Sequence, residues 1–178
     1  EVTIIIDDQL VFFDSSDVGL KYVNNDLQSI LNIPDEDADK LRIKWSNDNS
    51  SKNLDESDIR IKQIISSRLE EIIELALKKL KISKYYDLAN SHIVLTGEGA
   101  KHADIIDLAT NIFKTKNIRI GSPQKIHGLK TIIENPSNST CLGMLNYALS
   151  TEFQFNAKDE SDKKKSVLSM LYNFFKAI

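Results

Sequence analysis

Two short runs of strand-forming residues, joined by a glycine turn and a helical pattern, constrain the fold of this chain most. The first run is His92–Thr96, and Gly97 and Gly99 follow it directly. Apolar residues then recur at helical spacing over 100–115, and a second run occupies 118–121. The succession of strand, tight turn, helix and strand predicts one βαβ unit. The chain is therefore expected to contain an α/β domain.

The glycine turn is the part of this unit where a ligand would be expected. Ligands of α/β proteins usually bind at the turn after a strand. Gly97 and Gly99 carry no side chains there, so the backbone can approach a ligand closely, and the amides that open the next helix favour polar or anionic atoms. Many such turns carry glycine only because the chain must bend, so the turn alone leaves both interpretations open.

Composition narrows the class of protein. The chain has 178 residues, of which 41% are hydrophobic and 28% charged, which is typical of a soluble globular protein with one or two small domains. The net charge of −3 gives no reason to expect nucleic-acid binding. Cys141 is the single cysteine, and its apolar neighbours predict a buried structural thiol. No apolar run approaches the ~18 residues of a membrane-spanning helix.

A longer series of residues points to a family. The series includes the glycine turn and extends to Tyr147. Its members are Val94-Leu95-Thr96-Gly97-x-Gly99-Ala100, Ile118–Gly121, Pro123, Gly128-Leu129, Pro136, Ser139-Thr140 and Gly143-Met144-Leu145-x-Tyr147. In order and spacing this series resembles the C-terminal half of the FtsA family of bacterial cell-division proteins, which are actin-like and bind ATP. The resemblance implies half of an actin-like (ribonuclease-H-like) α/β fold, with a small, mainly helical subdomain inserted and a C-terminal amphipathic helix.

The resemblance also implies a division of the chain. Residues 1–33 and 84–157 would form the actin-like α/β subdomain, and 34–83 the small helical subdomain. Residues 158–165 would be a linker, and 166–178 a membrane-targeting helix. A glycine-rich phosphate-binding loop of the family would lie just before Glu1, so we expect a fragment that binds ATP weakly and does not hydrolyse it alone.

Local patterns predict the elements of the first half. Strand-like runs over 1–6 and 9–13 flank Asp7-Asp8 and predict a tight hairpin. A helix is expected from Asp17 or Gly19 to about Leu31. Pro34 opens the next helix with acidic residues in its first turn, where they favour the positive helix end.

The helix after Pro34 carries one half of the expected nucleotide site. By resemblance, Asp39 and Arg42 would face the adenosine of ATP or ADP, bound with Mg²⁺ in the complete protein, and Gly97, Glu98, Gly99 and Ala100 would form the opposite wall. The i, i+3 spacing puts Asp39 and Arg42 on one helix face. A solvated surface ion pair would have the same spacing. Glu98 departs from the family, which usually has glycine there.

A long amphipathic helix is expected from Asp55 to Lys81. Its apolar stripe consists of Ile61, Ile64, Ile65, Leu69, Ile72, Ile73, Ala76, Leu77 and Leu80. On this helix Arg68 and Glu71 match a family stretch associated with the C-terminal tail of the tubulin-like division protein FtsZ. A basic residue there can pair with carboxylates of an acidic peptide. We expect Arg68→Glu to weaken tail binding and to leave the thermal midpoint nearly unchanged.

The tail differs in kind from the rest of the chain. Its last segment, 166–178, places large apolar side chains within an arc of about 160° when wound as a helix. These are Val167, Leu168, Met170, Leu171, Phe174, Phe175 and Ile178, and Lys163, Lys164 and Lys165 precede the helix. A basic amphipathic helix on a linker fits an interfacial membrane anchor, although a terminal helix docked on its own domain would show the same pattern.

The function implied by the resemblance is to tether FtsZ filaments to the inner membrane. ATP would bind between the two halves of the complete protein, which would self-associate into actin-like filaments, have weak ATPase activity, and lie peripherally on the cytoplasmic face at the division site. We assign no catalytic residue, and His92, His102 and His127 lack metal-ligand spacing. Half of a pilus-assembly or chaperone ATPase, or of a small-molecule kinase, is the alternative.

Overall fold

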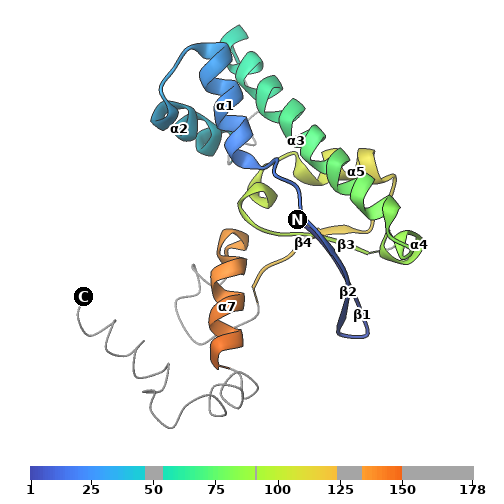
Figure 1. Cartoon of the computed structure of the whole chain (residues 1–178). Helices are drawn as coiled ribbons and strands as arrows, with labels where there is room; N and C mark the ends of the chain where they lie inside the picture. The colour runs from blue at the N-terminus through green and yellow to red at the C-terminus, as the bar shows by residue number, and fades with distance from the viewer. Residues whose placement is uncertain (47–53, 91, 124–133, 150–178) are drawn as a thin grey trace, which may run out of the picture. The chain divides into compact units, whose positions relative to one another are not determined.

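The computed structural model describes residues 1–46, 54–90, 92–123 and 134–149. The chain divides into two units, 1–139 and 140–178, and each is described by itself. The first unit is built along the long helix α3 (Glu56–Ile82). The helices α1 (Leu20–Leu31) and α5 (Ile105–Phe113) lie beside it, α1 near its beginning and α5 nearer its end (Figure 1).

The chain opens with the predicted hairpin. Strand β1 (Val2–Ile6) pairs antiparallel with β2 (Gln9–Asp14), so that Ile6 lies opposite Gln9. The two turn residues have left-handed φ values, 49° at Asp7 and 60° at Asp8. Such a two-residue turn matches the natural twist of a hairpin, and aspartate tolerates this backbone region well. The register shifts between Ile4 and Ile5, where one strand carries a β-bulge.

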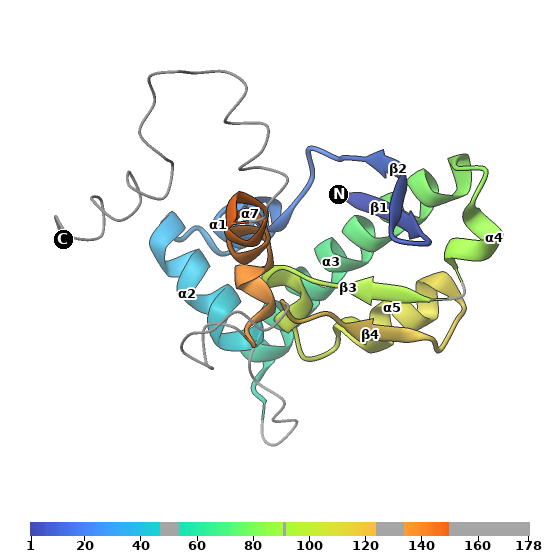
Figure 2. The ribbon, with the colours of Figure 1, turned by 90° about the horizontal axis from the view of Figure 1, so that it is seen from below.

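The predicted βαβ unit is also confirmed. Strand β3 (Ile93–Leu95) pairs parallel with β4 (Ile118–Ile120), and α5 lies between them in sequence (Figure 2). Gly121 follows β4 closely, where a Cβ atom would come within 2.6 Å of a methyl carbon of Val94. Glycine fits there without strain, whereas a side chain would require the Val94 side chain to shift.

The helix of this unit begins later than the sequence suggests. We expected it over 100–115, but a 3-10 turn, η1 (Glu98–Lys101), comes first, and α5 starts only at Ile105. The backbone of His102 is extended (φ −62°, ψ 132°), which interrupts the helical path. Apolar periodicity could not show this, because the apolar residues keep their spacing across the break.

The remaining helices follow their sequence signals. Helix α1 ends at Asn32, whose left-handed φ of 54° stops the helix. Helix α2 (Asp35–Ser46) starts after Pro34 with three acidic residues in its first turn. Helix α3 is capped by Asp55, whose side chain accepts a hydrogen bond from the Asp58 amide at 2.8 Å. A short helix, α4 (Tyr86–Ala89), follows it.

A hydrophobic core joins most of these elements. Its buried members come from β1, α1, α2, α3 and α5, and they are Ile4, Val23, Leu27, Ala38, Trp45, Ile61, Ile65, Leu69, Ile73, Leu80, Ile105, Ala109 and Phe113. Val23 and Leu27 are fully buried, and so is Ala38. The predicted apolar stripe of α3 therefore contributes more buried residues to the core than any other described element does. Within the described residues, no helix is long and apolar enough to cross a membrane.

A cavity of about 340 Å³ lies between the two sheets of the first unit. One side is formed by β1 and the other by β3, and Leu80, Leu88 and Phe113 also line it. Strand β1 pairs with β2 and strand β3 pairs with β4, so the described strands form two separate two-stranded sheets.

The glycine turn is joined to the segment before the last described helix. A short 3-10 turn, η2 (Pro136–Asn138), brings the Pro136 carbonyl within 3.1 Å of the Gly97 amide, which donates to it. The described part of the second unit belongs to helix α7 (Ser139–Leu149), none of whose residues is buried. The prediction of a buried Cys141 is therefore wrong, because apolar neighbours on a helix bury a thiol only where another element covers that face.

Candidate functional site

Arg42 is the centre of a polar cluster that joins three elements. The residue is only 7% exposed. Its Nη2 donates to Asp39 Oδ1 at 2.6 Å within α2, its Nε donates to Asn24 Oδ1 of α1 at 2.9 Å, and its Nη1 donates to Glu98 Oε1 of η1 at 3.0 Å. A guanidinium removed from water needs such partners, and here they hold α1, α2 and η1 together.

The charges of this cluster stabilise one another. Burial by itself would lower the pKa of Arg42, but the hydrogen bonds to Asp39 and Glu98 outweigh it and raise the pKa. The pKa of Asp39 is lowered, chiefly by the hydrogen bond from Arg42 and next by that from the Asn24 amide at 3.1 Å. Both shifts favour the charged forms of Arg42 and Asp39, and the guanidinium is held between the half-exposed side chains of Asp39 and Glu98.

The six residues expected to form the nucleotide walls lie together. Gly97 adopts φ 88° and ψ −176°, a backbone region that is essentially restricted to glycine. A Cβ atom there would meet nothing within 4 Å, so this turn has an open side. Gly99 instead lies against Leu20 of α1, 3.6 Å from where its Cβ would be, and Ala100 is buried.

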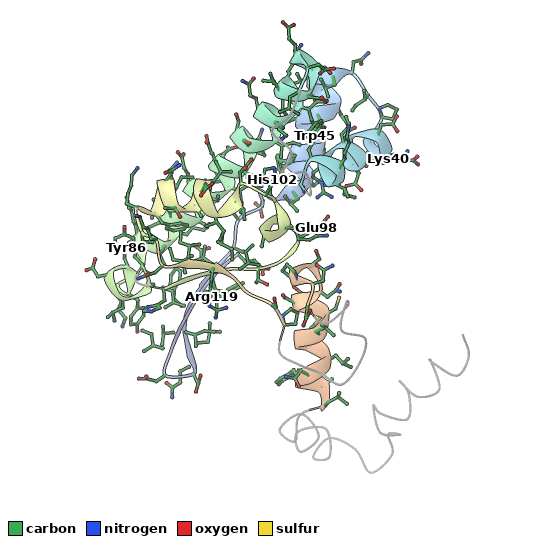
Figure 3. All side chains as sticks on the ribbon, turned by 180° about the vertical axis from the view of Figure 1, so that it is seen from behind. Lys40, Trp45, Tyr86, Glu98, His102 and Arg119 are labelled. Atoms are coloured by element: carbon green, nitrogen blue, oxygen red, sulfur yellow. The ribbon has the colours of Figure 1, made fainter. Side chains whose placement is uncertain are left out.

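Glu98 closes the space next to Arg42. Glu98 belongs to η1, on the same segment as His102 (Figure 3), and its carboxylate forms an ion pair with the Arg42 guanidinium. The cavity lined by Arg42, Glu98, Gly99 and His102 measures about 10 Å³, which is room for about one water molecule. Burial lowers the pKa of His102. In the described part of the chain, no group of three His, Cys, Asp or Glu side chains could hold a metal ion.

A second candidate site is a groove between α1 and α3, with a volume of about 400 Å³. Both residues assigned by resemblance to the FtsZ tail, Arg68 and Glu71, line it. The other lining residues are Asp26 and Ile30 of α1 and Arg60, Gln63, Ile64 and Ser67 of α3. The groove thus combines apolar side chains with both signs of charge.

Arg68 is held by partners from its own chain. Its Nε and Nη2 donate to the two carboxylate oxygens of Asp26 at 2.6 and 2.8 Å, and its Nη1 donates to Glu71. The bond to Asp26 is the main reason that the pKa of Arg68 is raised. This fork-shaped contact fastens α1 to α3, so we revise the expectation that Arg68→Glu leaves stability unchanged.

Sequence reasoning missed the partners that come from α1. Asn24 and Asp26 bind Arg42 and Arg68, which lie 18 and 42 positions further along the chain. Helical spacing reveals only pairs within one helix, such as Asp39 with Arg42 and Arg68 with Glu71.

The membrane assignments at 163–165 and 167–175 lie outside the described residues.

Comparison with known proteins places the chain in a family. A family model described as "Cell division protein FtsA" matches residues 1–143. The FtsA of Pseudomonas aeruginosa is 28% identical over 145 residues, which cover 71% of this chain and 34% of that protein. The FtsA of Buchnera aphidicola subsp. Acyrthosiphon pisum is 28% identical over 202 residues, covering 100% of this chain and 46% of that protein. Although it spans less than half the length of these relatives, the chain belongs to the FtsA family of cell-division proteins.

Proposed function

We propose that this chain is the part of an FtsA-type protein that joins FtsZ to the inner membrane. In this proposal it forms half of an actin-like fold, the α1–α3 groove takes the C-terminal tail of FtsZ, and the tail helix holds anionic lipid. The complete protein binds ATP between its two halves, self-associates into filaments, and lies on the cytoplasmic face at the division site. The match to the FtsA family over 1–143 carries the proposal.

The α1–α3 groove supports the tail-binding part. It places Ile30, which is 47% exposed, beside charged side chains in a groove with a volume of about 400 Å³. That volume lies within the range of ligand pockets. A short peptide that carries both acidic and apolar residues suits such a surface.

The test of this part is direct binding of the FtsZ tail. We expect a fluorescently labelled FtsZ C-terminal peptide to bind this chain, with a higher anisotropy as chain is added. A peptide of the same composition in scrambled order is the control, since it keeps the net charge but loses the arrangement of acidic and apolar residues. Equal titration curves for the two peptides would contradict the proposal.

The nucleotide part leads to a second expectation. Arg42 is already neutralised by Asp39 and Glu98, so the walls offer ATP an open turn at Gly97 but no available cation. We expect the chain to bind ATP at roughly millimolar concentration. Glu98→Gly should tighten binding about tenfold, because the released guanidinium can donate to a ribose hydroxyl, and a charged hydrogen bond contributes about 1.5 kcal/mol.

Isothermal titration calorimetry checks this expectation. Asp39 and Asn24 still hold Arg42 in the Glu98→Gly variant, so the fold should persist. Glu98→Gln is the matched variant, since it removes the charge and keeps the size of the side chain. Micromolar affinity in the unchanged chain, or no gain in either variant, would show that the pair does not limit nucleotide binding.

A further inference from the structure

We propose that His102 fastens the turn η1 to α2 only while its imidazole is neutral, so that this contact opens in mild acid. His102 is 6% exposed. It stands at the break between η1 and α5, where its extended backbone interrupts the helical path. The contact is formed within the chain, so it is separate from the function proposed above.

The hydrogen bonds around His102 require the neutral ring. Its Nδ1 accepts a hydrogen bond from the backbone amide of Asp104 at 3.3 Å. A nitrogen that accepts cannot carry a proton, whereas an imidazolium carries one on both ring nitrogens. The amide between these two residues, that of Ala103, donates to the Ser46 carbonyl at the end of α2 at 3.0 Å. The segment that joins η1 to α2 is therefore built around an unprotonated Nδ1.

The surroundings of His102 give an imidazolium little support. Burial is the main reason that the pKa of His102 is lowered; the Asp104 carboxylate acts against this shift, and Lys62 of α3 adds to it. Arg42 of α2 and Glu98 of η1 line the same small cavity as His102, and they are paired with each other. The cavity holds about one water molecule, which cannot hydrate a buried cation as bulk water does.

Acid therefore shifts the equilibrium toward the open form of this contact. When the contact is open, His102 is in water and takes up a proton near its ordinary pKa of about 6.5. In the closed form the pKa is lower, so the closed form binds fewer protons. The stability of the closed form is thus fully present above about pH 6.5, and it falls by up to about tenfold in the equilibrium constant for each pH unit below that value. Opening also separates Glu98, which belongs to η1, from Arg42.

Trp45 can report on this contact without a label. It is the single tryptophan of the chain, it is 3% exposed, and it directly precedes Ser46, whose carbonyl accepts from Ala103. Figure 3 labels both Trp45 and His102. We expect the fluorescence maximum of the unchanged chain to move to longer wavelength between about pH 7.5 and 5.5, the range in which an unperturbed histidine titrates. The shift would follow from exposure of the indole to water.

Amide hydrogen exchange measures the opening directly. The Ala103 amide exchanges when its bond to Ser46 breaks. After correction for the intrinsic effect of pH on exchange, its protection should fall at least about fivefold over the same pH range. The amide of Ile73, a buried residue within α3, should keep its protection. Equal losses at both amides would mean that the whole unit loosens in acid and would contradict a local contact.

His102→Asn removes the titrating group and keeps the acceptor. The asparagine oxygen can accept from the amide two residues on, as Nδ1 does, but the side chain takes up no proton in this pH range. We expect the protection of Ala103 to change by less than about twofold in this variant. The matched control is His92→Gln, which removes an exposed imidazole and should keep the full response. A response that persists in His102→Asn, or that disappears in His92→Gln, would overturn the assignment to His102.

Two charge variants leave His102 in place, so that the test does not depend on the folding of His102→Asn. Lys62→Gln removes a cation that disfavours the imidazolium, so the loss of Ala103 protection in acid should become smaller. Asp104→Asn removes a carboxylate that favours the imidazolium, so the loss should become larger. The Asp104 side chain caps no amide of α5, so this replacement should leave the helix intact. Losses that change in the same direction in both variants, or that change in neither, would contradict the proposal.

Discussion

Replacing Arg68 by glutamate should lower the free energy of unfolding by about 3 kcal/mol. Arg68 and Asp26 are each about three-quarters removed from solvent, with side chains 23% and 25% exposed. Removing one partner of such a pair leaves the other charge without compensation, which costs about 3–5 kcal/mol when burial is complete and less when it is partial. The new carboxylate would also stand beside Asp26 and Glu71. For a chain of this length, the thermal midpoint should fall by about 6–10 °C.

Two further variants separate the causes of this loss. Arg68→Met keeps the length of the side chain and removes the charge without adding a third carboxylate, so its melting temperature should lie between those of the unchanged chain and Arg68→Glu. Arg60→Glu makes the same charge reversal on the same helix, and we expect a change within about 0.5 kcal/mol. Thermal melts followed by circular dichroism provide the comparison. Equal destabilisation at both positions would contradict the role assigned to the Asp26 contact.

Replacing Phe174 and Phe175 by glutamate should abolish binding to anionic vesicles. If the tail lies in the interface as a helix, each phenylalanine contributes about 1.5–3 kcal/mol by leaving water. Losing both corresponds to more than a hundredfold in affinity, before the repulsion between glutamate and anionic lipid is counted. Lys163, Lys164 and Lys165 add on the order of 1 kcal/mol each on such a surface. Deleting 166–178 should have the same effect.

Sedimentation with vesicles measures this binding. Phosphatidylglycerol vesicles should carry the unchanged chain to the pellet, and pure phosphatidylcholine vesicles should carry less of it, because the lysines then contribute little. Replacing the three lysines by glutamine is the matched variant, which should lose the preference for phosphatidylglycerol and keep the apolar contribution. An unchanged chain that stays in the supernatant, combined with a double variant that no longer melts cooperatively, would identify the helix as a docked part of the core.

Sequence alone predicted the elements whose signals are local. The Asp7-Asp8 turn, the start of α3 next to Asp55 and the apolar stripe of α3 each depend on residues a few positions apart, and the structure has all three where they were expected. The parallel pairing of β3 with β4 follows from a strand, a glycine turn and a second strand in one short stretch. Family resemblance then brought Asp39, Arg42 and Glu98 into one candidate site.

What the sequence could not show depends on contacts between elements. The sequence showed Glu98 only as a departure from the glycine that is usual in the family. It lies 56 positions from Arg42, and only the fold shows that the two side chains neutralise each other. The break at His102 could not be read from spacing, because apolar residues continue on both sides of it. Whether Cys141 is buried depends on what covers α7, and periodicity within one helix carries no information about a neighbour.

The β-bulge in β2 has a consequence for how copies of this chain behave at high concentration. Hairpins and short parallel pairs expose rows of amide and carbonyl groups, and such rows can recruit the same strand from another molecule. Ile5 and Leu10, both 64% exposed and paired across the hairpin, would add an adhesive apolar contact. Ile4 and Ile5 pair with Phe12 and Leu10, which leaves Val11 of β2 as an extra residue, and such a bulge bends its strand and puts successive amides out of line. A second strand can then follow the edge for only two or three residues, which hinders fibrous aggregation and favours solubility.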